Sequence, residues 1–143
     1  MRFMIIRRAD EQTEAGVFPE HSAQLFEEMG NYMEDMNRAG ILLGGQGLHP
    51  SSEGVKIQYG GAEPTVVDGP FAEAKELIAG FHLIDVSSKE EAIEWVKRWP
   101  AAIDNNPTVE IRQVLEAEDF GEALTPELQA KEAELRATAE GSL

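Results

Sequence analysis

The sequence predicts an α+β domain built on an antiparallel sheet and followed by a short acidic helical extension. Three observations lead to this: short β-prone runs with alternating side chains, two amphipathic segments with helical spacing between them, and glycine or proline at the boundaries. The chain has 143 residues, of which 42% are apolar, so it can bury one core and is too apolar for a disordered protein.

The first predicted strand covers residues 2–8, where both faces carry apolar side chains, as in an interior strand. Helical spacing then begins at Pro19, which suits a first helical position, and extends to Arg38 before Gly40, which suits a helix end. The apolar positions of this helix are Leu25, Phe26, Met29, Met33 and Met36.

The centre of the chain predicts a strand and a hairpin. Residues 41–43 are β-prone and lead into the glycine-rich residues 44–47, which predict a turn where chain segments approach closely. This run is no dinucleotide-binding loop, because no helix follows it. Apolar and polar side chains alternate over residues 55–59, and residues 65–67 can form a second, antiparallel strand. Together these two runs predict a hairpin.

The second half of the chain predicts a helical turn over residues 72–78, a buried strand over 81–86 and a last strand over 109–115. Between these strands, Ser88 and Glu91 have the spacing of a capping box for a helix that reaches about Trp99. Without the hairpin the order is strand, helix, strand, strand, helix, strand, which is that of the ferredoxin-like βαββαβ fold.

That fold places two helices on one face of the sheet and leaves the other face bare. A bare apolar face is unfavourable in water, and a second copy related by a two-fold axis is its simplest cover. We therefore expect a homodimer.

The charge and cysteine content exclude several classes of function. Twenty-seven acidic against twelve basic residues give a net charge of -15, which repels phosphate backbones and anionic lipids, so no direct contact with nucleic acid or membrane is expected. Without cysteine there is no disulfide, thiolate nucleophile or cysteine zinc site. The first nine residues resemble neither a signal peptide nor a membrane span, so a cytoplasmic location is expected.

The C-terminal segment is acidic. We divide the chain into a domain over residues 1–117 and an acidic helical extension over residues 118–143. Thr125-Pro126-Glu127 is a good helix start, but the apolar stripe after it is too thin to hold an isolated helix. This helix is expected either to dock on the domain or to reach a partner subunit.

Several separate motifs occur in a fixed order along the chain. They are Asp68-Gly69-Pro70-Phe71-Ala72-Glu73, Lys75-Glu76, Gly80-Phe81, Glu91-Ala92-Ile93-Glu94-Trp95 and Val109-Glu110-Ile111-Arg112. Together they resemble the DGPF branch of the YCII-related family. The resemblance implies a dimeric α+β barrel with a pocket between sheet and helices, and for some relatives an association with extracytoplasmic-function sigma factors.

Two residues are the candidate catalytic groups. His21 follows Pro19, and this setting resembles that of a histidine for which shorter family members have a proposed aspartate partner. The position of that partner falls near Arg38 here. Imidazole titrates near neutral pH, so His21 is the candidate base, unless it is an ordinary surface histidine. Asp68, at a strand end, is the candidate carboxylate, with capping of the next turn as its alternative role.

Three further residues are candidate ligand contacts: Glu73, Lys75 and His82. Glu73 and Lys75 could orient a polar ligand, or they could be a solvated face. His82 is expected in a strand, either packed or lining a pocket. The three histidines of the chain lack metal-ligand spacing, so no metal site is predicted, and no cofactor is predicted either.

These observations lead to two hypotheses of function. The first is a small-molecule enzyme or binding protein whose pocket lies between sheet and helices, with His21 and Asp68 as proton-handling groups or polar anchors. The alternative is a non-catalytic regulatory or interaction module, linked to sigma-factor-type regulation, that acts through its dimer and its acidic helix.

Overall fold

The computed structural model describes residues 1–73 and 76–140. The chain separates into two compact units, Met1–Gln113 and Val114–Leu143, which are described here one at a time. The boundary expected after residue 117 stays a prediction.

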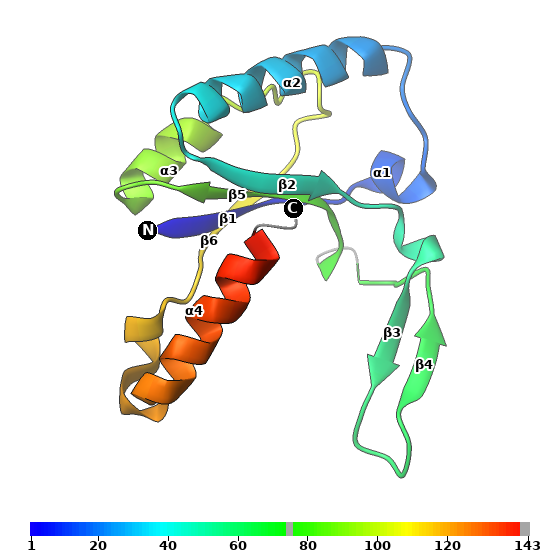
Figure 1. Cartoon of the computed structure of the whole chain (residues 1–143). Helices are drawn as coiled ribbons and strands as arrows, with labels where there is room; N and C mark the ends of the chain where they lie inside the picture. The colour runs from blue at the N-terminus through cyan, green and yellow to red at the C-terminus, as the bar shows by residue number, and fades with distance from the viewer. Residues whose placement is uncertain (74–75, 141–143) are drawn as a thin grey trace. The chain divides into compact units, whose positions relative to one another are not determined.

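The first unit contains a four-stranded antiparallel sheet in the order β2-β5-β1-β6. Its strands are β1 (Arg2–Arg8), β2 (Leu42–Gly47), β5 (Ile78–Asp85) and β6 (Val109–Gln113). The two main helices, α2 (Ser22–Arg38) and α3 (Lys89–Val96), lie on one side of the sheet (Figure 1). Along the chain the order is β1, α2, β2, β5, α3, β6, so the predicted ferredoxin-like fold is confirmed.

The core lies between the sheet and these two helices. β1 pairs with β5 on one side and β6 on the other, which confirms it as an interior strand. Its alternate residues Phe3 and Ile5 are 1% exposed and face the helices. The buried hydrophobic residues are Phe3, Ile5, Tyr32, Met36, Ile41, Ile84, Val86 and Ala92. The alternate apolar residues of the strands and the helically spaced apolar residues of α2 and α3 thus form one core layer.

The predicted hairpin is confirmed as β3 (Val55–Gln58) and β4 (Thr65–Asp68), paired in antiparallel register. The chain then turns through Gly69 and Pro70, which are joined by a cis peptide bond. A Cβ atom on Gly69 would lie only 1.7 Å from the carbonyl oxygen of Ser51. Only glycine therefore fits this position of the turn.

The structure differs from the sequence predictions at three helix or turn segments. A short helix, α1 (Glu11–Ala15), was not predicted, although Asp10 and Thr13 form a complete capping box at its start. Helix α2 begins at Ser22, because the Ser22 amide and hydroxyl both bond the carbonyl oxygen of Pro19 and hold a separate turn there. Residues 74–75 of the predicted turn over 72–78 lie outside the described residues, and residue 78 already begins β5.

The glycine-rich segment belongs to strand β2 and not to a turn. A Cβ atom on Gly45 would lie 2.5 Å from Cδ2 of His82 and 2.7 Å from the carbonyl oxygen of Phe81. The close approach predicted for this segment is therefore confirmed at Gly45. The glycine makes room for the imidazole ring of the neighbouring strand.

The second unit contains the short 3-10 segment η3 (Ala117–Ala123) and helix α4 (Pro126–Glu140). The hydroxyl of Thr125 accepts a hydrogen bond from the amide of Leu128 at 3.3 Å, as expected for a helix start. Leu128 and Leu135 are 49% and 61% exposed. In the part of the chain that the structure describes, no helix is both long and apolar enough to cross a membrane.

The contact between Gly45 and His82 makes a prediction about stability. Gly45→Ala should lower the free energy of unfolding by about 1–3 kcal/mol, because the added methyl group overlaps the imidazole ring. Urea denaturation measures this change as a shift of the midpoint, provided that the dependence of the free energy of unfolding on urea concentration is the same in both proteins. Gly44→Ala is the matched control, since a Cβ atom there meets nothing within 4 Å. Equal midpoints for the two variants would contradict the prediction.

Candidate functional site

A buried ion pair joins the end of β1 to the loop between α3 and β6. Arg7 is 6% exposed, and its Nε and Nη2 atoms donate to the two carboxylate oxygens of Asp104 at 3.1 and 2.9 Å. Asp10 accepts a third bond, at 3.3 Å. Burial lowers the pKa of Arg7, but the bonds and charges of Asp104 and Asp10 outweigh burial, so the pKa is raised above its usual value. The guanidinium therefore stays charged.

The same loop is fixed at two more points. Trp99 Nε1 donates to Asp104 Oδ2 at 2.9 Å, and Arg7 Nη2 donates to the Asp104 carbonyl oxygen at 2.8 Å. Nε2 of His21 lies 2.9 Å from the carbonyl oxygen of Ile103 and donates to it, because a carbonyl can only accept. His21 thereby holds the start of α2 against this loop.

His82 lies between the sheet and the helices, in contact with aromatic rings. It is 9% exposed, and its ring centroid lies 5.5 Å from that of Trp99 and 6.5 Å from that of Tyr32. Its Nδ1 atom is buried and has no hydrogen-bond partner among the described residues. Burial lowers the pKa of His82, so the imidazole is neutral at neutral pH. A buried polar atom without a partner is costly and calls for a functional or solvent explanation.

Tyr32 is held in this layer by its hydroxyl group, which donates to the carbonyl oxygen of Trp95 at 2.8 Å. Burial raises the pKa of Tyr32 to about 12, so the phenol stays protonated. The layer therefore contains a neutral phenol and a neutral imidazole.

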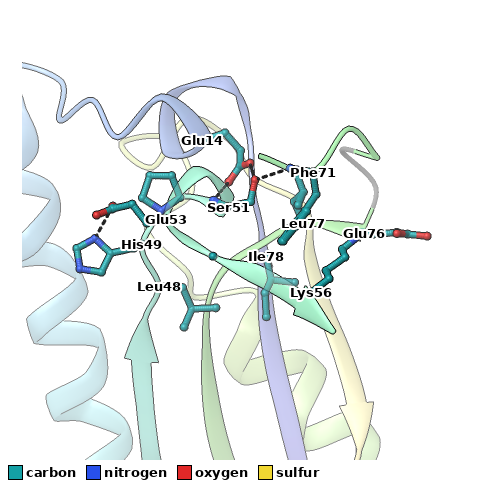
Figure 2. A pocket seen from close by; sticks show the side chains of 12 residues that line it. Glu14, Leu48, His49, Ser51, Glu53, Lys56, Phe71, Glu76, Leu77 and Ile78 are labelled. Atoms are coloured by element: carbon teal, nitrogen blue, oxygen red, sulfur yellow. Dashed lines mark hydrogen bonds and ion pairs between the residues drawn. The ribbon is translucent and has the colours of Figure 1, made fainter. Parts of the chain in front are cut away.

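A cavity of about 420 Å³ lies where β2 ends and β5 begins, at the base of the hairpin. Figure 2 shows the side chains around it. They come from α1, the loop after β2, the 3-10 segment η1 (Ser51–Glu53), β3, the turn after β4 and the start of β5 with the two residues before it. The residues that line it are Glu14, Leu48, His49, Pro50, Ser51, Glu53, Gly54, Lys56, Phe71, Glu76, Leu77 and Ile78.

Hydrogen bonds to Ser51 fix one wall of this cavity. The Ser51 amide donates to Glu14 Oε2 at 3.0 Å, and its hydroxyl donates to the other oxygen of the same carboxylate. The Ser51 hydroxyl also accepts from the amide of Phe71 at 3.1 Å. Ser51 thus links α1, η1 and the Asp68-Gly69-Pro70-Phe71 turn, as the dashed lines in Figure 2 show.

The sequence and the fold can now be compared with those of known proteins. A model of the YCII-related domain matches residues 1–118. The chain belongs to the YCII-related family. It is similar to the Uncharacterized protein R00369 of Rhizobium meliloti (strain 1021), with 27% identity over 112 residues, which are 78% of this chain and 90% of that protein.

One solved structure gives a further comparison. The 5-chloro-2-hydroxyhydroquinone dehydrochlorinase (TftG) from Burkholderia phenoliruptrix AC1100, in complex with 2,5-dihydroxybenzoquinone, is similar with a TM-score of 0.46 and 12% identity. The match covers 82% of this chain and 97% of that chain.

The two candidate catalytic residues of this YCII-related protein lie in different elements, and neither lines the cavity. His21 is the exposed N-cap residue of α2, without a capping bond from its side chain. Asp68 is exposed at the end of β4, opposite Val55 in the hairpin register. Their catalytic roles stay predictions.

The candidate ligand contacts have three different placements. Glu73 is exposed in the loop after the turn, outside the cavity lining, and Lys75 lies outside the described residues. His82 is buried between sheet and helices. Among the residues that the structure describes, no three histidine, aspartate or glutamate side chains come together as a metal site would need.

Sequence reasoning did not identify Glu14, Ser51 or Lys56 as site residues. Glu14 and Ser51 are 37 residues apart, and Ser51 and Phe71 are 20 residues apart. No spacing within one element signals such contacts. The family resemblance points to this region, since it extends to Gly47-Leu48 and Pro50-Ser51 as well as to the Asp68-Gly69-Pro70-Phe71 motif.

The lowered pKa of His82 predicts how stability depends on pH. Between its lowered pKa in the folded state and about 6.5, the usual value, the unfolded chain binds a proton that the folded chain does not. The free energy of unfolding should therefore rise with pH in this window, by up to about 1.4 kcal/mol per pH unit from this residue. His82→Phe should remove this part of the slope.

Urea denaturation of both proteins from pH 5 to pH 7 measures this slope. The comparison uses slopes and not absolute stabilities, because phenylalanine also changes the packing against Gly45. Identical slopes in the wild type and in His82→Phe would show that the imidazole does not titrate differently on folding.

Proposed function

We propose that this YCII-related protein binds a small molecule in the cavity beside the Asp68-Gly69-Pro70-Phe71 turn. The cavity itself carries this proposal, since its volume of about 420 Å³ lies within the range of ligand sites, about 300–1,000 Å³. Five apolar side chains line it, Leu48, Pro50, Phe71, Leu77 and Ile78, together with six polar or charged ones. This composition suits a ligand with an apolar body and one or two polar groups.

The walls of the cavity support the proposal because contacts within the chain hold them in place. Ser51 is bonded to both Glu14 and Phe71, and close packing fixes Gly69 against Ser51. Walls that are already ordered reduce the entropy lost on binding. In this proposal the DGPF motif builds the site through its backbone and Phe71.

A second candidate site is the layer between sheet and helices that the sequence hypothesis favours. The buried Nδ1 atom of His82, without a partner in the described chain, supports it. A ligand donor or acceptor at this atom would satisfy it. His21 and Asp68 remain its candidate proton-handling groups, with Glu73, Lys75 and His82 as ligand contacts.

A thermal-shift screen against a metabolite panel separates these sites. A ligand at a hundred times its dissociation constant adds about 2.7 kcal/mol to the stability of the protein. Leu48→Trp should fill the cavity and abolish the shift given by a hit, whereas Ala23→Trp, at an exposed position of α2, should keep it.

The outcomes of the screen differ for the two sites. If a ligand still stabilises Leu48→Trp but no longer stabilises His82→Phe, its binding site is the layer between sheet and helices. No hit with any of the folded proteins would contradict small-molecule binding. The alternative, an interaction module linked to sigma factors, would then be tested by pull-down with and without residues 118–143, where equal recovery of partners would refute a role of the acidic segment.

We also propose that the protein is a homodimer through the sheet face opposite α2 and α3. Met4 and Ile6 alternate with the buried Phe3 and Ile5, so they lie on that opposite face. Beside them, Glu110 pairs with Arg8 at 3.7 Å and with Arg112 at 3.1 Å. An apolar strip beside charges of both signs is self-complementary about a two-fold axis.

Light scattering during size-exclusion chromatography tests the dimer. The wild type should have twice the chain mass of 15.7 kDa, and Ile6→Glu should have the single mass, because a buried carboxylate at the interface is unfavourable. Ala23→Glu on α2 should stay dimeric. A wild type with the single-chain mass would contradict the proposal.

A further inference from the structure

Among the described residues that line the cavity, Lys56 carries the lysine ammonium group. It lies on β3 between Val55 and Ile57, and by strand alternation it points to the opposite face of the hairpin. On that face its Nζ atom lies 4.3 Å from the centre of the Phe71 ring, and the side chain lines the cavity. The strand thus directs one ammonium group to the site.

The three glutamates that line the cavity with Lys56 are Glu14, Glu53 and Glu76. Both oxygens of Glu14 accept bonds from Ser51. Glu53 Oε2 lies 3.0 Å from His49 Nδ1, an ion pair when the histidine is protonated. The carboxylate of Glu76 points away from the other labelled side chains in Figure 2.

Lys56 itself has neither an ion pair nor a hydrogen bond within residues 1–73 and 76–140. All three N–H donors of its ammonium group are therefore available to a ligand, apart from its contact with the Phe71 ring. In a chain with a net charge of -15, an unpaired cation beside apolar side chains is a specific feature.

We propose that the cavity binds a small carboxylate with an apolar body, whose carboxylate group accepts hydrogen bonds from Lys56 Nζ. This inference rests on the proposed function of the cavity and adds the chemical class of its ligand. Leu48, Leu77 and Ile78 would contact the apolar body. A hydrogen bond between two charged groups is about twice as strong as a neutral one, so a carboxylate uses this donor best.

Glu14, Glu53 and Glu76 line the same cavity, and their charges oppose this preference. At about 0.15 M salt, exposed charges more than about 8 Å apart are largely screened, whereas a direct contact is screened much less. The proposal requires that the direct contact with Lys56 outweighs this repulsion. If repulsion dominated instead, an ammonium ligand would bind more tightly than a carboxylate.

Three probes with one body and different charge test the inference: 3-phenylpropionate, 3-phenylpropionamide and 3-phenylpropylamine. Calorimetric titration of the full chain at 0.15 M salt should show the carboxylate binding about tenfold more tightly than the amide, and the amine most weakly. Lys56→Gln should bind carboxylate and amide with equal affinity. Lys97→Gln should keep the tenfold difference, since Lys97 pairs with Glu94 on α3, outside the cavity lining.

Each result supports or overturns a distinct statement. Equal binding of carboxylate and amide by the wild type, or tightest binding of the amine, would overturn the carboxylate class and leave the cavity as a site. If Lys56→Gln still binds the carboxylate tenfold more tightly than the amide, a group other than Lys56 binds the carboxylate. If no probe binds and the metabolite panel also gives no hit, the cavity is not a ligand site.

Discussion

The buried pair of Arg7 and Asp104 is the contact on which the arrangement of the first unit depends. Burying two charges costs several kcal/mol for each ion, and only a two-pronged geometry with further hydrogen bonds offsets this. Here the guanidinium has both carboxylate oxygens, a backbone carbonyl and a second carboxylate as partners. Asp104 also holds the indole of Trp99, whose ring covers His82. A single ion pair thus connects the central strand to the loop and to the aromatic layer.

The structure gives the DGPF motif a mainly architectural role. Its aspartate is exposed, its glycine is required by the contact with the Ser51 carbonyl group, and its phenylalanine provides both a backbone amide and a ring to the cavity. The motif determines the shape of a wall, and the polar groups in that wall come from α1, η1 and β3. The polar chemistry of the cavity therefore depends on residues outside the motif.

The fold could be predicted from the sequence because its signals are local. Alternation in β1 and helical spacing in α2 each lie within one element, and turn residues mark the boundaries between elements. Phe26 shows the limit of this reasoning, since it has core spacing but is 57% exposed and meets Phe18 edge-on. The bonds between Arg7 and Asp104 join residues 97 positions apart, and no periodicity within an element encodes them. The sequence around His21 predicts a base, and the structure adds a hydrogen bond from its Nε2 atom to the carbonyl oxygen of Ile103.

The packing of Gly45 under the His82 ring ties two distant sequence positions together. A ring at position 82 requires the absence of a side chain at position 45, because both occupy the same volume between neighbouring strands. A side chain at position 45 would overlap the backbone of β5 as well as the ring, since the carbonyl oxygen of Phe81 lies 2.7 Å from the added Cβ atom. A smaller residue at position 82 would remove only one of these two overlaps, so β2 and β5 can approach this closely only with glycine at position 45.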